Sequence, residues 1–505
     1  MTKKKKTAPP TPGPDDIRRR CEAYLEAVNR EEYLFASGLK AETDLFDIEE
    51  TYADLPDLAT VQAVTKELAK ARGDDALRIF HLLNFLLDQI METQVGPLQN
   101  RLYARQGKAT LKIREASLPF RRSQAALAAE PDRVVRLLIG SEQHRVFAHL
   151  NPILVTILKT LHATSKKLNR GGHVELCARR IGVNLPRLGE AVDRFLSDTR
   201  DLYLEQMERA ARERLGLALD DLRREDMAFM LGGSEFDEAF PAGNMVSLAE
   251  RIQKEMGLDP TAGGRIAYDL EEREGKSHRA CAYMIRVPDE LVVSLRAKAG
   301  PAAMRQFLEE VGQALHRAAV DPSLPFEFRC LGFPPVFQAS GHLLGRLLLD
   351  RSWLAKQPGI GKNPDPLLSS LALKEIYFLR LLAAQFRYEM ALHGDKSPEK
   401  LDVVFSDMIA EHCSVRFAPE AYLYLTDFHF NSARYLQGLL LESVLRRRLR
   451  ERFGHDWFSK RDVGGFLRDL WKGGARLTYS DAMERLGGKE TDLSPLVDDL
   501  KSLLA

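Results

Sequence analysis

Residues 304–320 constrain the fold most, because their apolar residues recur at the spacing of one helix face. Apolar side chains occupy positions 304, 307, 308, 311, 314, 315 and 318, and this spacing predicts a helix with one buried stripe. Beside the stripe, Glu309, Gln313 and His316 are four and three residues apart, so they project along nearly one line. Glu310 adds a second carboxylate next to this line.

The order of these polar residues resembles the zinc-binding helix of gluzincin peptidases. There, H-E-x-x-H holds two imidazoles one turn apart on a metal ion, and the Glu between them is the general base for a zinc-bound water. The similarity is greatest to the thimet oligopeptidase and oligoendopeptidase F family, whose helix reads roughly H-E-x-G-H-A-x-H. The frame is kept at four positions, Glu310, Gly312, Ala314 and His316. The two ligand histidines are replaced by Glu309 and Gln313.

Further segments extend the resemblance in the family's order. Residues 269–281 are similar to the segment that leads into the hairpin beside the metal. Residues 321–329 and 337–344 resemble the segment that carries the third ligand, normally a Glu, and that position holds Gln338 here. A helix with two adjacent glutamates and one histidine is common and would by itself indicate no function. The ordered set of segments is what favours the resemblance.

The resemblance implies a mainly α-helical, zincin-like oligopeptidase fold. Two helical lobes would enclose a deep channel, with a small β-sheet beside the central helix. Residues 15–225 would form an N-terminal helical wall, and residues 226–505 the peptidase-related domain. The only strands that the sequence predicts clearly are residues 280–287 and 291–296, and in the family a substrate peptide pairs with the edge of this sheet. The Lys- and Pro-rich residues 1–14 are predicted to be a disordered tail.

The residues at the ligand positions argue against zinc. A carboxamide is a weak ligand for a cation that prefers imidazole and thiolate, so Glu309, Gln313 and Gln338 predict that no metal cofactor is bound. Glu310 would keep the general-base position without a metal-activated water. In place of the metal we expect the glutamines, with His316 or His342, to hydrogen-bond the two carboxylates.

The C-terminal part holds candidate oxyanion donors. Residues 422–438 resemble the family's aromatic-rich stretch, where a Tyr with a His nearby donates to the tetrahedral oxyanion. Tyr435 and Gly438 keep the family frame, and Tyr424 and His429 are further candidates. Residues 442–453 contain five arginines and two glutamates, which predicts an exposed helix face with i,i+4 ion pairs.

Periodicity and capping signals predict helices elsewhere as well. Ser, Thr, Asp or Asn before an apolar-periodic run, Pro in the first turn and Gly after the last turn mark helix ends. Helices are predicted in the segments 15–28, 57–70, 74–95, 134–139, 184–214 and 370–390, with Pro131 just inside the fourth start. Residues 79–91 are the most apolar stretch, yet too short and too polar to span a bilayer.

Composition excludes several function classes. Lys and Arg total 73 against 72 Asp and Glu, so the net charge indicates neither nucleic acid nor an anionic membrane as partner. The five cysteines are scattered without a C-x-x-C, so neither disulfides nor a thiolate zinc site is expected from their spacing. The Gly-Gly pairs belong to no phosphate-binding pattern. A reducing cytoplasm suits this sequence.

These observations favour a catalytically inactive oligopeptidase-like protein that retains a peptide-binding cleft. It would act by binding a peptide or a protein partner. One alternative is an active metallo-oligopeptidase with a metal site rebuilt from Glu309, Glu310, His316 and His342. Another is a structural subunit of a complex, in which the channel has closed.

Overall fold

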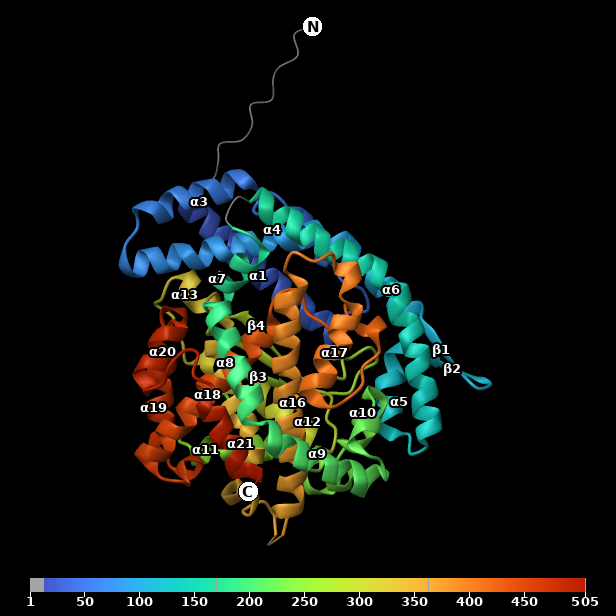
Figure 1. Ribbon diagram of the computed structural model, residues 1–505. Coiled ribbons are helices and arrows are strands. Elements are labelled where there is room, and N and C mark those ends of the chain that lie inside the picture. Colours follow the sequence, from blue (N-terminus) through green and yellow to red (C-terminus); the bar gives the residue numbers. More distant parts are fainter. Residues whose placement is uncertain (1–12, 169–170, 362, 505) are drawn as a thin grey trace.

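The computed structural model describes residues 13–168, 171–361 and 363–504, and this part of the chain is mainly helical (Figure 1). The prediction of a mainly α-helical chain with a small sheet is confirmed. The first nine helices are α1 (Pro14–Ala36), α2 (Leu45–Thr51), α3 (Leu58–Lys70), α4 (Gly73–Lys108), α5 (Ser123–Ala129), α6 (Arg133–Lys167), α7 (His173–Ile181), α8 (Leu185–Asp198) and α9 (Arg200–Leu215).

The remaining helices follow from the middle of the chain to its end. They are α10 (Arg224–Met230), α11 (Met245–Glu255), α12 (Pro301–Ala318), α13 (Phe326–Cys330), α14 (Pro334–Gly345), α15 (Arg351–Leu354), α16 (Asp365–Leu392), α17 (Asp402–Cys413), α18 (Asn431–Phe453), α19 (Asp462–Trp471), α20 (Tyr479–Leu486) and α21 (Ser494–Leu504). In Figure 1, α3 and α4 lie across the top, α6 descends on the right, and α16 runs through the middle.

Side-chain caps explain several helix ends. Asp57 Oδ1 accepts from the Thr60 N–H at 2.6 Å, and Asn184 Oδ1 accepts from the Arg187 N–H at 3.0 Å, so both predicted starts have their cap. At α6 the prediction needs correction, because Asp132 is the N-cap and Pro131 lies before the helix rather than inside it.

The predicted helix 184–214 is in fact two helices. Thr199 separates α8 from α9, with φ −104° and ψ 0°. Its hydroxyl donates to the Phe195 carbonyl at 2.7 Å and accepts from Arg380 Nη1 at 2.7 Å. The same guanidinium nitrogen donates to the Leu196 carbonyl at 2.6 Å. A distant arginine thus stabilises the break, which periodicity within one segment could not reveal.

A mixed three-stranded sheet lies beside α12. Its strands are β3 (Ile266–Asp269), β4 (Cys281–Arg286) and β5 (Glu290–Ser294), in the order β3-β5-β4, with β3 parallel and β4 antiparallel to β5. The predicted pair is β4 and β5. The prediction missed β3 and a separate hairpin of β1 (Thr110–Ile113) and β2 (Ala116–Pro119), each only four residues long.

Two predictions concern the N-terminus and membranes. Most of the predicted tail, residues 1–12, lies outside the described residues, and Pro14 is the first residue of α1. Helix α6 is long and apolar enough to cross a membrane by length and composition alone, but half of its apolar window is buried inside the protein. The core helix of a soluble protein passes the same test of length and composition.

Candidate functional site

Three glycines let α12 and α14 approach closely. A Cβ at Gly312 would lie 2.3 Å from the Ser340 carbonyl oxygen, and a Cβ at Gly345 would lie 2.4 Å from Glu309 Cγ. A Cβ at Gly341 would lie 2.6 Å from the Glu309 carbonyl oxygen. At these contacts the residue numbers increase along α14 while they decrease along α12, so the two helices cross in antiparallel directions. Their backbones are in close contact there.

Two of the positions that resemble ligand positions, Glu309 and Gln313, contact α14 across this crossing. Glu309 Oε1 is 3.5 Å from His342 Nδ1. Gln338 lies one turn before His342 on α14, and a Cβ at Gly438 of α18 would lie 3.2 Å from its Cβ. Gln313 Cγ packs 3.1 Å from the Cβ position of Gly341. The Oε1 of Gln338 is buried without a hydrogen-bond partner among the described residues.

Arginine and histidine side chains, rather than amides, lie against the carboxylate of Glu309. Arg305 Nε donates to Glu309 Oε1 at 3.2 Å, and His342 Nδ1 lies 3.5 Å from the same oxygen. Burial alone would raise the pKa of Glu309, but His342 and Arg305 lower it to about 2. Within the described ranges, neither Gln313 nor Gln338 hydrogen-bonds Glu309, so the partners differ from those predicted. Arg305 was missed, although its i,i+4 spacing to Glu309 is the signal of a helix ion pair.

Glu310 occupies a different environment. Its Oε2 accepts the Ala282 N–H of β4 at 2.9 Å. Burial raises the pKa of Glu310 to about 7, the Ala282 hydrogen bond opposes this rise, and the charge of Glu309 adds to it. The pKa values of these two adjacent carboxyl groups on one helix are therefore shifted in opposite directions from their ordinary value.

The edge of the sheet beside α12 is covered. Strand β4 is one of the two edge strands, but its Met284 carbonyl accepts from Asn29 Nδ2 of α1 at 2.9 Å, and its Ala282 N–H donates to Glu310. Tyr33 of α1 packs on Tyr283 with ring centroids 5.5 Å apart. A peptide could pair with this edge only after α1 moved away.

His316 lies away from the carboxylates. It is 1% exposed, its Nδ1 is 2.8 Å from Ser340 Oγ, and its ring stacks on Trp471 with centroids 5.4 Å apart. Burial lowers the pKa of His316 well below its ordinary value. His316 therefore packs as a neutral core side chain, while His342 is the histidine that reaches Glu309.

The three candidate oxyanion donors lie in different places. Tyr435 is beside the crossing, with its ring 4.6 Å from that of His342, and burial raises its pKa, as does the nearby Glu309. Tyr424 is stacked on Phe147, with centroids 4.6 Å apart, in the wall of a separate cavity. His429 belongs to a cluster of histidines near α7.

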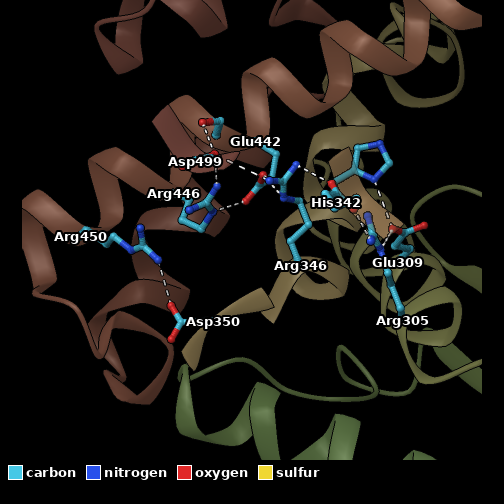
Figure 2. Close-up of polar contacts among 11 residues, drawn as sticks. Arg305, Glu309, His342, Arg346, Asp350, Glu442, Arg446, Arg450 and Asp499 are labelled. Carbon is cyan, nitrogen blue, oxygen red and sulfur yellow. Dashed lines mark hydrogen bonds and ion pairs between the residues drawn. The ribbon is translucent and has the colours of Figure 1, made fainter. Parts of the chain in front are cut away.

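A chain of buried ion pairs runs from this crossing toward the C-terminus (Figure 2). Arg305 Nη1 binds Glu375 at 2.6 Å, and Arg346 binds both Glu375 and Glu442, at 3.1 and 3.2 Å. Glu442 also pairs with Arg446 at 2.7 Å, and Arg446 reaches Asp499 of α21. The prediction of an exposed face for residues 442–453 is wrong for Glu442 and Arg446, because these tertiary partners cover them.

A cavity of about 750 Å³ lies between the N-terminal helices and α16. Its aromatic and amide side chains come from the N-terminal helices and from α16 and the segments after it. Its positively charged side chains are Arg121, Arg224 and Lys374. No Asp or Glu lines it among the described residues. Phe378 in its wall packs edge-on against Tyr435 at 5.3 Å, so one layer of rings separates the cavity from His342.

The residues of the crossing do not assemble a set of metal ligands. Throughout the part of the chain that the structure describes, one group brings three His, Cys, Asp or Glu ligand atoms within 4.8 Å of one another, and it contains no residue of α12 or α14. Glu309 and His342 face each other, whereas Glu310 turns to Ala282 and His316 turns to Ser340. A scan against protein-family models and a search of curated proteins both find no match to this chain.

The raised pKa of Glu310 predicts a pH dependence of stability. Its pKa is about 7 in the folded chain against an ordinary 4.5. Between these values the unfolded chain releases its proton first, so the free energy of unfolding falls as pH rises from 4.5 to 7, by on the order of 3 kcal/mol. Glu310→Gln should remove this fall, as read from urea unfolding of both proteins across this pH range.

Glu309 provides the opposite control. Because its pKa is lowered to about 2, its contribution to stability is present above pH 4.5 and is lost as pH falls toward 2. Glu309→Gln should therefore flatten the acid limb of the stability curve and leave the fall between pH 4.5 and 7 in place. Identical pH profiles for wild type and Glu310→Gln would contradict the assignment.

Proposed function

We propose that this protein binds acidic peptides, or acidic segments of a partner protein, without cleaving them. In this proposal it is a non-catalytic relative of the thimet oligopeptidase and oligoendopeptidase F family, with the zincin-like two-lobed fold. The observation that carries the proposal is the Arg305 guanidinium against Glu309, at the position of the first ligand. Because a cationic side chain of the protein pairs with the carboxylate at this position, the two helices need no metal ion there.

The cavity between the N-terminal helices and α16 supports peptide binding. Its amide side chains can hydrogen-bond a peptide backbone, and its rings can pack on apolar side chains. Lys374 is half-buried there and has no ion pair with a carboxylate among the described residues. Burial lowers the pKa of Lys374, the nearby Arg305 lowers it further, and the charge of Glu235 opposes them only in part, so a carboxylate on the ligand would relieve an unfavourable charge.

The other two candidates have less support. A rebuilt metallopeptidase site needs Glu309, Glu310, His316 and His342 to face one point, whereas His316 faces Ser340 and Glu310 faces Ala282. The structural-subunit alternative is favoured by one observation, the cover of the β4 edge by α1. The five cysteines are free, which suits the cytoplasmic location that we include in the proposal.

Loss of the Lys374 charge should weaken binding of an acidic peptide about tenfold or more. A hydrogen bond to a charged group contributes roughly 1.5–3 kcal/mol, and about 1.4 kcal/mol is a factor of ten. Calorimetric titration of Lys374→Met with an Asp- and Glu-rich peptide, and with the same peptide carrying Asn and Gln, measures the effect.

The matched control is Lys298→Met, which removes an exposed lysine outside the cavity lining. This variant should bind the acidic peptide like the wild type. Equal affinities for Lys374→Met and Lys298→Met, or no preference for the acidic peptide in the wild type, would count against the cavity as the binding site.

A further inference from the structure

Four of the chain's twelve histidines gather far from the crossing of α12 and α14, where α6, α7, the end of α16 and the loop before α18 meet. The ring of His173 lies 4.9–5.6 Å from those of His162, His393 and His429. Cys177 is one turn after His173 on α7, so its thiol projects on the same side of the helix. In the sequence, His162, His173 and Cys177 lie more than 200 positions before His393 and His429.

Three of these side chains present potential ligand atoms to one another. The ligand atoms of His173, Cys177 and His429 all lie within 4.8 Å of one another, and His173 Nε2 is 3.5 Å from Cys177 Sγ. Tetrahedral zinc with Zn–N near 2.0–2.1 Å and Zn–S near 2.3 Å sets an N···S distance of about 3.6 Å. The pair on α7 already has this distance, and because the His429 ligand atom lies within 4.8 Å of both, it needs to approach by at most about 1 Å.

We propose that His173, Cys177 and His429 bind a divalent transition metal ion of the zinc type. Two imidazoles and a thiolate are the ligands that zinc prefers. On binding, the Cys177 thiol gives its proton to solvent, and the metal exchanges water ligands for the three side chains. The fourth position is left to a water molecule or to a carboxylate from α4.

The surroundings of His173 can orient it for this role. Its Nε2 now donates to the Phe428 carbonyl at 2.7 Å, while its Nδ1 is 3.3 Å from Ser165 Oγ. If the ring proton sits on Nδ1, it can donate to Ser165 Oγ, which itself donates to the Leu161 carbonyl at 2.8 Å. Nε2 then offers its lone pair to the metal, which requires the Phe428 carbonyl to turn away from it. A ligand histidine that donates through its second nitrogen is the usual arrangement.

The loop that presents His429 is held firmly. Asp427 accepts the backbone N–H groups of His429 and Asn431, at 2.6 and 2.9 Å, and also the side-chain amide of Asn431 at 2.8 Å. The imidazole of His429 has no hydrogen-bond partner among the described residues, and it lies edge-on to His173. It is thus available as a ligand from a preformed loop.

The space beside the three ligands suits a single ion. A cavity of about 20 Å³ is lined by His173, Cys177 and His429, and by Asp88, Glu92 and Arg180, against the roughly 10–15 Å³ that one water needs. Asp88 and Glu92 of α4 supply negative charge on the exposed side. Arg180 opposes a cation, but its guanidinium donates to the His429 carbonyl at 3.1 Å and lies 3.9 Å from Asp88.

The proposal is tested with Zn²⁺ and Co²⁺ on the full chain. Wild-type protein should bind about one Zn²⁺ per chain by elemental analysis, and Co²⁺ should give a thiolate-to-cobalt charge-transfer band. Cys177→Ser should abolish this band and lower Zn²⁺ affinity by more than the ten- to hundredfold that loss of an outer hydrogen-bond partner costs. Ser165→Ala should show that smaller loss and keep the band.

Cys413→Ser is the matched control, because Cys413 is also a fully buried free cysteine but lies on α17 outside the cluster. It should keep both the metal and the band, and circular dichroism checks that every variant is folded. No uptake of Zn²⁺ by the folded wild type, or equal uptake by Cys177→Ser and Cys413→Ser, overturns the proposal. Neither outcome bears on the Lys374 cavity, whose ligand needs no metal.

Discussion

A variant with Glu309→His, Gln313→His and Gln338→Glu is expected to bind about one zinc ion per chain at the crossing of α12 and α14. The first two positions are one turn apart on α12, and position 338 is on α14, which crosses α12 in close contact. The three changes supply two imidazoles and a carboxylate, which is the ligand set of a His₂Glu zinc site.

The measurement is zinc content by elemental analysis in a Cys177→Ser background, so that metal at the histidine cluster is not counted. The Cys177→Ser chain without the three changes is the control and should take up well under one equivalent. Failure of the folded variant to bind zinc would mean that positions 309, 313 and 338 do not converge. The zincin-like interpretation of α12 and α14 would then have to be abandoned.

The same variant should cleave short peptides weakly at best. The resemblance assigns Glu310 as the general base, but hydrolysis also needs an oxyanion donor, and loss of one such donor costs on the order of a hundred- to a thousandfold in rate. Tyr435 is the candidate donor nearest the crossing, and a ring layer with Phe378 separates it from the cavity. A quenched-fluorescence peptide assay, with Tyr435→Phe as the control, measures this activity.

Arg346→Met is expected to lower the free energy of unfolding by about 3–5 kcal/mol, the usual cost of removing one partner from a buried ion pair. Arg346 is 3% exposed and binds Glu375 and Glu442, which are themselves buried. Without Arg346, the buried carboxylates of Glu375 and Glu442 would keep only Arg305 and Arg446, respectively, of the two arginines that each contacts. Urea unfolding followed by circular dichroism measures the change.

Arg447→Met on α18 is the matched control for this prediction. Arg447 is half-exposed and pairs with the exposed Asp498 at 3.3 Å, so the expected loss is about 0–1 kcal/mol. If Arg346→Met destabilised the protein no more than Arg447→Met does, the chain of ion pairs in Figure 2 would contribute little to the fold.

Local signals in the sequence predicted much of the fold. The apolar stripe of residues 304–320 became α12, and the caps at Asp57 and Asn184 set the starts of α3 and α8. Tertiary contacts decided the rest. Arg380 divides the predicted helix at Thr199 from 181 positions away, and Glu442 is buried because Arg346 reaches it from another helix.

The candidate site was only partly predictable for the same reason. The spacing within α12 places Glu309 and Gln313 on one side, but it cannot show that Arg305 would turn to Glu309 or that His342, rather than His316, would lie beside it. The cover of the β4 edge by α1 depends on Asn29, 255 positions from Met284. The sequence indicates His429 as one of three candidate oxyanion donors, and only the folded chain brings it to His173 and Cys177.

The most direct test of the proposed function is to incubate the wild-type protein with a peptide library that spans acidic, neutral and basic sequences. Mass spectrometry of the retained and free fractions reads binding and cleavage in one experiment. Retention of intact peptides, enriched in Asp and Glu and reduced in Lys374→Met, is the predicted result. Cleavage products that disappear in Glu310→Gln would contradict it, because they would show a working peptidase.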